Sequence, residues 1–323
     1  IMIKEFIKEN EGKQYKFIEV DNGNNLKITF CDIGAAIYSV YYKGKLMTFT
    51  PNDFDYFIKN GMHYGKVIGR VAGRIKNGCY SINGKEHRIN DDNQHVLHSG
   101  FGFQWYVFDL DYDENENEVI VHFDLLSKTM DQGLPGELHV DVYYHIFKKE
   151  DAFEIEFKAI SSEDTYCNLT NHVYWNLEGD NTRDILEEKL IINADKYVDI
   201  DQELIINDII PVNEIFDFRQ GMKFKEHMKD AAAMYPCASG YDHDYILNDT
   251  SLACILFSSD ENIVLKVYTD NPVCHLFTQN PIPENERYHA VALEMQKEVF
   301  FLDKILLKKN ELYHQTTKYV FES

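Results

Sequence analysis

The sequence is poor in positive charge, and this deficit narrows the partners that the protein can have. Its 323 residues include 32 lysines and arginines against 54 aspartates and glutamates, which gives a formal net charge of −22. Such a surface repels nucleic acid and anionic membranes, and it disfavours strongly anionic substrates unless a basic pocket receives them. No basic run in the sequence provides one. We therefore expect a neutral small molecule as partner, with no nucleic acid and no membrane.

Cysteine pairs with the spacing of metal or redox motifs are also missing. The six cysteines lie far apart, and none forms a C-x-x-C: Cys31, Cys79, Cys167, Cys237, Cys254 and Cys274. Reduced, mostly buried thiols are therefore expected in place of a disulfide framework or a zinc knuckle. The first residues, IMIKEFIKEN, hold no apolar segment typical of a secretory signal. No apolar run approaches the ~20 residues that span a bilayer, so we expect a cytoplasmic protein.

Helical periodicity and linker-like composition are scarce as well. Only two short stretches, 54–60 and 223–234, look helical, and the seven prolines are scattered. A prior of roughly 150 residues per domain would suggest two domains, but it is weak for all-β chains. Because no composition shift divides the chain, residues 1–323 are predicted to form a single domain.

Alternation of apolar and polar residues with a period of two dominates instead. Residues 137–147 show it, and residues 153–159 repeat it after the turn-like KKED. Two such runs around a short turn predict an antiparallel hairpin. Asn-Gly pairs at 22–23 and 83–84 predict two more tight turns. The pattern predicts an all-β fold of two large packed antiparallel sheets with few short helices.

The acidic segment 111–119 has part of the spacing of a calcium-binding loop. Oxygen-bearing side chains occupy positions 1, 3, 5 and 12 of that pattern: Asp113, Asn115, Asn117 and Asp124. The sixth position, where such loops need glycine for a sharp turn, is Glu118. A solvated loop between two strands is therefore the favoured interpretation.

Residues 168–177, NLTNHVYWNL, combine a histidine with amides, a hydroxyl and aromatic rings. Amides and hydroxyls match the groups of a polyhydroxylated ligand, and flat rings cover its C–H faces. His172 can transfer protons near neutral pH in such a setting. From this segment alone, a buried strand whose polar side chains are simply satisfied is an equal alternative.

Residues 69–78, GRVAGRIKNG, place glycines beside two arginines. The glycines allow the backbone to turn close to a ligand, and a guanidinium fork can reach into the site. Arg70 and Arg74 are four positions apart, so on a strand both would share one face. Surface arginines on a glycine-rich loop are an equal alternative.

Residues 95–108, HVLHSGFGFQWYVF, bring small residues directly after His98. These residues let the backbone approach a partner closely, and Trp105 would supply a flat apolar wall. His95 and His98 are conceivable metal ligands. No matched third and fourth ligands follow them, so no metal is expected.

Two carboxylates complete the set of candidate residues. Asp242 follows a turn-like stretch and precedes a strand, where it can accept hydrogen bonds from vicinal hydroxyls; His243 and Asp244 compete for this role. Glu294 interrupts the apolar run of HAVALEMQ. A carboxylate at that position costs free energy unless it is paired or used, so its pKa is expected to be perturbed. A buried structural salt bridge is the alternative.

Together these segments resemble the aldose 1-epimerase (galactose mutarotase) family. The resemblance runs from about residue 24 to about residue 303. It rests on GR-x-A-x-RI, HSGFGFQW, NLTNH-x-Y-x-NL, G-x-DH and LE-x-Q in the order of the family. Membership implies a β-supersandwich that interconverts the α and β anomers of free aldohexoses such as galactose and glucose, with no cofactor.

The resemblance also implies roles for five residues. Glu294 would act as the base at the O1 hydroxyl and His172 as the acid at the ring oxygen O5, because opening a hemiacetal needs both transfers. Rotation about C1–C2 of the open aldehyde and reclosure would complete the reaction. His98 would hydrogen-bond near O5 or O1, while Arg74 and Asp242 would hold sugar hydroxyls.

The chain departs from the family's pattern around the sugar. Gly73 stands where asparagine is common, HSG replaces HGG at Ser99, DHD replaces DHN at Asp244, and TQN replaces TGN at Gln279; KEVFF follows LE-x-Q. The preferred sugar is therefore left open, as is the oligomeric state.

Three other functions remain as alternatives. A glycoside hydrolase or lyase of the same architecture would use Glu294 and Asp242 as its carboxylate pair. A sugar-binding module without catalysis would not need both His172 and Glu294. A hexose-phosphate epimerase ranks lower, because the net charge and a single binding arginine suit a neutral sugar.

Overall fold

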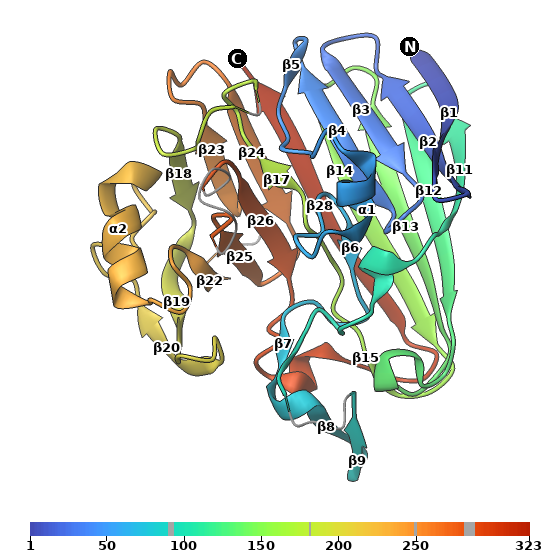
Figure 1. Cartoon of the computed structure of the whole chain (residues 1–323), viewed down its shortest axis with the longest axis vertical. Helices are drawn as coiled ribbons and strands as arrows, with labels where there is room; N and C mark the ends of the chain where they lie inside the picture. Colours follow the sequence, from blue (N-terminus) through green and yellow to red (C-terminus); the bar gives the residue numbers. More distant parts are fainter. Residues whose placement is uncertain (90–93, 181, 249–250, 281–287) are drawn as a thin grey trace.

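Antiparallel strands make up most of the structure, arranged in two packed layers (Figure 1). The computed structural model describes residues 1–89, 94–180, 182–248, 251–280 and 288–323. Within these residues, one layer is a nine-stranded sheet in the order β11-β12-β13-β14-β28-β24-β23-β18-β21. In that order its strands are Asp109–Glu114, Glu118–Ser127, Leu138–Phe147, Ala152–Ser161, Leu312–Glu322, Val264–Thr269, Cys254–Phe257, Lys189–Ile192 and Met222–Lys223.

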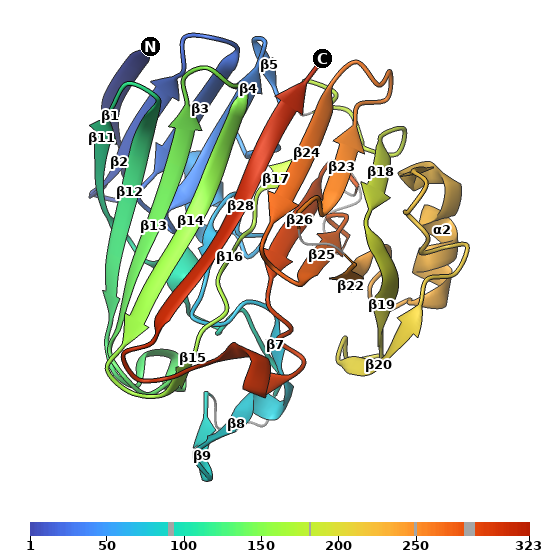
Figure 2. The same ribbon diagram turned by 180° about the vertical axis from the view of Figure 1, so that it is seen from behind.

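Two separate sheets form the second layer, behind the long strands that face the viewer in Figure 2. The N-terminal sheet runs β1 to β5 (Met2–Asn10, Lys13–Asp21, Leu26–Cys31, Ala36–Tyr42 and Lys45–Leu46). The other has the order β17-β26-β25-β22-β19-β20 (Tyr174–Trp175, Val291–Gln296, Val273–Phe277, Asp242–Leu247, Ala194–Ile200 and Ile206–Pro211). The predicted all-β supersandwich is confirmed, with its second layer divided in two.

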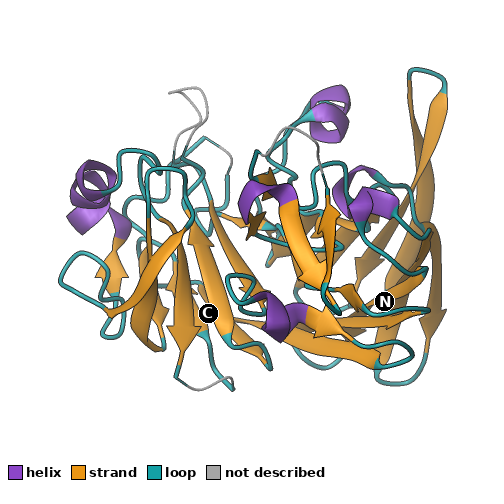
Figure 3. Cartoon of the chain, turned by 90° about the horizontal axis from the view of Figure 1, so that it is seen from below, coloured by secondary structure: helices purple, strands orange, loops and turns teal. Residues whose placement is uncertain are grey.

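Short ladders and helices connect these sheets. The two-stranded ladders are β6 with β16, β7 with β10, β8 with β9, and β15 with β27 (Val67–Ile68, Thr170–Asn171; Arg74–Ile75, Val96–Leu97; Cys79–Ile82, Lys85–Arg88; Thr165–Tyr166, Leu306–Leu307). The helices are short segments between strands (Figure 3): α1 and α2 (Phe54–Lys59, Phe224–Met234) and the 3-10 turns η1 to η4 (Lys76–Gly78, Phe103–Trp105, Asp131–Gly133, Leu302–Ile305). No helix in the described ranges is long and apolar enough to cross a membrane.

The period-two pattern accounts for the core. Strands β13 and β14 pair as the predicted hairpin, and the alternate residues of β13 are fully buried: Leu138, Val140, Val142, Tyr144 and Ile146. The two Asn-Gly pairs lie in the β2–β3 and β8–β9 turns, and α1 and α2 match the two predicted helices. Segment 111–119 holds the end of β11, the start of β12 and the turn between them, so the predicted loop is confined to residues 115–117.

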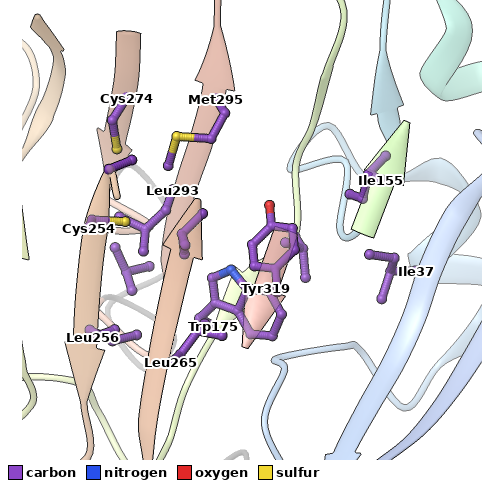
Figure 4. Close-up of a cluster of buried hydrophobic side chains, with 14 of the residues drawn as sticks. Ile37, Ile155, Trp175, Cys254, Leu256, Leu265, Cys274, Leu293, Met295 and Tyr319 are labelled. Carbon is purple, nitrogen blue, oxygen red and sulfur yellow. The ribbon is translucent and has the colours of Figure 1, made fainter. Parts of the chain in front are cut away.

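Trp175 lies in the core and not in the cavity described below (Figure 4). Its side chain is fully buried, with ring centroids 5.2 Å from Tyr319 and 5.9 Å from Phe321. The two partners belong to β28 of the opposite layer. Trp175 therefore packs the layers together behind the site.

Candidate active site

A cavity of about 410 Å³ collects the candidate residues from five distant segments of the chain. Its lining includes every residue predicted to act in the site: Arg74, His98, His172, Asp242 and Glu294. Aliphatic side chains of the β19–β20 hairpin, among them Ile200, Leu204 and Ile206, form one wall. The cavity thus has a polar floor and a largely apolar wall.

Three neighbouring strands supply the floor. Asp244 of β22 pairs in register with His275 of β25, and His275 pairs with Glu294 of β26. Because side chains alternate between the faces of a strand, Asp242, Phe277 and Gln296 share this face and line the cavity. Residues on the opposite face of these strands enter the hydrophobic core: Tyr245, Leu276, Leu293 and Met295.

His172 and Glu294 form a buried pair at this floor. His172 Nε2 lies 3.4 Å from Glu294 Oε1, and their side chains are 6% and 2% exposed. Burial lowers the pKa of His172 below its usual value, and the Glu294 charge opposes this shift only in part. Within the described chain, the only ion pair of Glu294 is the one with His172. This carboxylate therefore faces an acid/base partner and no structural lysine or arginine.

The amides next to His172 hold the backbone and do not contact the imidazole. Asn171 Nδ2 donates to the Gly65 carbonyl at 2.9 Å, and the His172 amide donates to the Lys66 carbonyl at 2.8 Å. Asn168 accepts from the Lys297 amide at 2.9 Å and donates to Ala72. These amides therefore fix the segment from which the ring projects.

His98 is held in a defined tautomer. The Gly73 amide donates to His98 Nδ1 at 3.1 Å, and the His98 amide donates back to the Gly73 carbonyl at 2.9 Å. Since Nδ1 accepts a hydrogen bond, the proton of the neutral ring is on Nε2. Burial lowers the pKa of His98 well below its usual value, so the neutral form prevails. His98 therefore offers an N–H donor to the cavity.

This tautomer bears on metal binding. Donor atoms of His98, His172 and Glu294 lie within 4.8 Å of one another. A metal would need the Nε2 lone pair of His98, but that nitrogen carries the proton while Gly73 donates to Nδ1. The arrangement fits a hydrogen-bonding site better than a metal centre.

Arg74 and Asp242 face each other across the cavity. Arg74 Nη2 lies 3.5 Å from Asp242 Oδ2, and His275 Nε2 lies 3.0 Å from Asp242 Oδ1. Burial alone would raise the pKa of Asp242, but Arg74 and His275 outweigh it and hold that pKa well below its usual value. Asp242 is therefore a permanent carboxylate that accepts hydrogen bonds.

Arg70 does not share a face with Arg74, so that prediction is wrong. Its side chain is fully buried and donates to Ser127 Oγ at 2.9 Å and to the backbone carbonyls of residues 127, 128, 134, 135 and 136. The segment after β6 is irregular and no continuous strand joins the two arginines. Arg70 shapes the loop that carries η3, while only Arg74 lines the cavity.

Other expectations for this region are also corrected. Gly69 and Gly102 allow chain segments, not a ligand, to approach: a Cβ on Gly102 would lie 2.2 Å from the Gly69 carbonyl oxygen. Trp105 is outside the cavity lining and packs edge-on against His63 at 5.2 Å. His95 lies 3.4 Å from Glu203 and is likewise outside the lining.

Two residues that depart from the family's pattern, Ser99 and Gln279, form hydrogen bonds to other segments around the cavity. Ser99 Oγ accepts from the Val71 amide at 2.8 Å and links the segment of His98 to that of Arg74. Gln279 donates to the Tyr64 hydroxyl at 3.3 Å. Neither residue lines the cavity.

The sequence interpretation missed several lining residues: His63, His275, Phe277 and Gln296. Asp244, which was named as a competitor of Asp242, also lines the cavity. The alternation in VCHLF and LEMQ was the available signal, since it puts residues 275, 277, 294 and 296 on one face. His63 carries no such signal, because it lies in a turn with φ 56°.

The fold and the cavity define a β-supersandwich with a buried acid/base pair at the floor of a polar pocket. The family model for aldose 1-epimerase matches residues 16–320. An aldose 1-epimerase of Haemophilus influenzae is 31% identical over 304 residues, covering 88% of this chain and 87% of that protein. A galactose mutarotase of Rattus norvegicus is 28% identical, covering 82% and 80%.

Solved structures agree with the family match. The GalM/aldose epimerase homologue from C. elegans superposes with a TM-score of 0.83 at 28% identity, over 95% of this chain and 98% of that one. A galactose 1-epimerase from Lactobacillus acidophilus has the same fold, with a TM-score of 0.89 at 24% identity over 99% of both chains. The chain belongs to the aldose 1-epimerase family, whose enzyme class is isomerase.

Proposed function

We propose that the protein interconverts the α and β anomers of free aldohexoses such as galactose and glucose. The observation that carries this proposal is the pair of buried side chains His172 and Glu294, 3.4 Å apart at the floor of the cavity. Ring opening of a hemiacetal needs one proton removed at O1 and one delivered at O5, the two oxygens that are bonded to C1. A base and an acid in contact fit this requirement.

The chemistry follows from the pair. In the protein molecules whose His172 is protonated, Glu294 removes the proton of the O1 hydroxyl, and the C1–O5 bond breaks as the imidazolium protonates O5. The lowered pKa of His172 makes this imidazolium the minor form at neutral pH but a stronger acid. The open aldehyde rotates about C1–C2 and closes from the other face with the two transfers reversed, so that the pair ends as it began. Each positioned acid or base typically contributes about 10² to 10⁴ in rate.

The remaining polar residues have binding roles in this proposal. His98 donates its Nε2 proton near O5 or O1. Arg74 donates to sugar hydroxyls and the permanent carboxylate of Asp242 accepts from them, which is the complementarity that hydroxyls require. None of these steps calls for a cofactor or a metal.

Broader properties are proposed on the same basis. A sugar is the partner of the family, and the acidic surface supports a neutral sugar over nucleic acid, membranes or anionic metabolites. The six cysteines are free thiols, which supports a cytoplasmic location. One hydrophobic cluster extends from Ile18 to Phe321, which supports a single domain over residues 1–323.

The hydrolase alternative is not favoured. It requires one carboxyl group with a raised pKa as general acid, whereas Arg74 and His275 hold the pKa of Asp242 below its usual value.

Polarimetry on freshly dissolved α-D-glucose and α-D-galactose tests the proposal. The wild type should accelerate mutarotation over the buffer rate, and Glu294→Gln and His172→Asn should each lower kcat by about 10² to 10⁴. His314→Gln serves as matched control, because His314 pairs with Glu156 on the exposed face of β28. Absence of acceleration by the wild type refutes the activity on these sugars; full activity in either site variant refutes the assigned roles.

A further inference from the structure

His275 is an ionisable group at the cavity floor that the proposed acid/base step does not use. It projects from β25 between Asp242 and Asp244, with its side chain 16% exposed. Its Nε2 lies 3.0 Å from Asp242 Oδ1, and its Nδ1 lies 2.9 Å from Asp244 Oδ1. Both ring nitrogens therefore face carboxylate oxygens.

This geometry fixes the charge of the ring. An ionised carboxylate only accepts hydrogen bonds, and a neutral imidazole has a single N–H. Asp242 is held ionised by Arg74, and Asp244 accepts a second hydrogen bond from Gln296 Nε2 at 2.9 Å. Two donors are thus required of His275, so the ring is an imidazolium. In agreement, the two carboxylates raise the pKa of His275 well above its usual value despite burial.

We propose that His275 is a positioning residue, a fixed imidazolium that keeps Asp242 ionised and aimed at the sugar, with Asp244 as its counter-charge. The inference rests on the proposed function, because it assigns Asp242 to the sugar hydroxyls. His275 itself has no N–H left for substrate. It acts through Asp242.

The surrounding charges define what removal of His275 would do. From the cavity face it meets Arg74, His172, Asp242, Asp244 and Glu294, and His243 lies on the other face of β22. Without the imidazolium, three carboxylates would share one cation, Arg74, on this floor. Burial, which is the largest influence on Asp242, would then outweigh Arg74 and raise the pKa of Asp242 above its usual value. Protonation of Asp242 would therefore compete with sugar binding as the pH falls.

Asp244 and His275 should therefore behave as a unit. Loss of either one leaves a buried charge without its partner, which is more costly than loss of both. The double substitution Asp244→Asn/His275→Gln removes one negative and one positive charge together. The introduced glutamine amide would still be able to donate to Asp242 and to accept from the introduced asparagine amide.

Mutarotase kinetics between pH 5 and 8 test this unit. His275→Gln and Asp244→Asn should each raise KM roughly ten- to a hundredfold and change kcat much less. In His275→Gln, KM should climb further below pH 6, while the wild-type KM stays flat. The double variant Asp244→Asn/His275→Gln should return to within about threefold of wild type, with His314→Gln as the unchanged control.

A structural role alone predicts a different result. Additive losses in the double variant, or a wild-type KM with a flat pH profile in His275→Gln, would overturn the proposal.

The charge of the ring has a readout that needs no turnover. Nitrogen-15 NMR of the histidine-labelled protein should show His275, assigned by its loss in His275→Gln, doubly protonated from pH 5 to pH 9. A neutral ring at pH 7 would overturn the inference. A wild type that is inactive in polarimetry but keeps the imidazolium would refute the proposed function and the positioning role while leaving the charge assignment intact.

Discussion

At the scale of single residues, the partners of buried ionisable groups distinguish those that belong to the site from those that only destabilise the fold. His172 and Glu294 are buried in contact with each other, and the partly buried Asp242 faces Arg74. Glu188 is also fully buried, but one of its oxygens accepts from the Leu177 amide at 2.6 Å, and the other has no hydrogen-bond partner among the described residues. Burial raises the pKa of Glu188 well above its usual value.

This shift predicts a pH-dependent stability. An acid whose pKa is higher in the folded than in the unfolded state loses stability as pH rises from the unfolded value, about 4.3, through the folded value. At pH 8 the free energy of unfolding of Glu188→Gln should therefore exceed that of the wild type by roughly 1–3 kcal/mol. The variant should unfold at a higher denaturant concentration. The gain should disappear near pH 4.

Denaturation at both pH values measures this difference, with the exposed neighbour Glu187→Gln as control. Equal stability of wild type and Glu188→Gln at pH 8 would contradict the account of Glu188.

A second prediction separates the two arginines of GRVAGRIKNG. Arg70→Lys should lower the free energy of unfolding by roughly 3 kcal/mol, because several buried carbonyls lose their donor. Arg74→Lys should raise KM about tenfold or more, because a point charge replaces the guanidinium fork, with stability within about 1 kcal/mol. A lowered stability in Arg74→Lys with unchanged KM would reverse the assignment.

At the scale of elements, the loop before β7 delivers both Arg74 and the support for His98. Gly73 has φ +84°, and a Cβ there would lie 2.5 Å from Val299 Cγ1. Its amide also fixes the His98 tautomer. Glycine is therefore required at this position: it adopts the positive φ without strain, leaves room for Val299 and still offers its backbone amide to His98.

Gly73→Ala should therefore lower kcat/KM roughly tenfold by displacing the backbone that anchors His98. Val299→Ala added to it should recover part of the loss by relieving the contact, but not the strain of positive φ. Steady-state kinetics of the wild type and both variants measure this. Wild-type kinetics in Gly73→Ala would show that the loop does not need this geometry.

Some of the elements could be predicted from the sequence and others could not, for physical reasons. Alternation predicted β13 and β14 because one face of each strand is buried along its whole length. The segment of Arg70 was left open between a strand and a loop, because glycines and apolar residues in a short run do not define a period. His275 was missed because local alternation assigns it to a face of its strand but does not identify its neighbours, which follow from the register of β22, β25 and β26.

At the scale of the whole molecule, the fold brings together in one cavity five site residues that are spread in the sequence between positions 74 and 294. The five site residues could be predicted as a set from the resemblance, and the structure places all of them in the cavity. The geometry of these residues, above all the His172–Glu294 contact, could not be predicted from the sequence, because it arises from packing between β16 and β26.

The net charge of −22 also acts at this scale. Glucose 6-phosphate should show a kcat/KM at least about tenfold below that of glucose, because the acidic field and the carboxylates on the floor oppose its phosphate. Added salt should narrow the gap by screening. Coupled assays at low and high ionic strength measure both values, and a preference for the phosphate ester would contradict a neutral substrate.

Exchange NMR on equilibrated, carbon-13-labelled galactose tests the central claim most directly, because it observes the two anomers interconverting with no net reaction. The account predicts exchange cross-peaks between the α and β C1 signals with wild-type protein, lost in Glu294→Gln and His172→Asn. Exchange at the buffer rate with folded wild-type protein would contradict it.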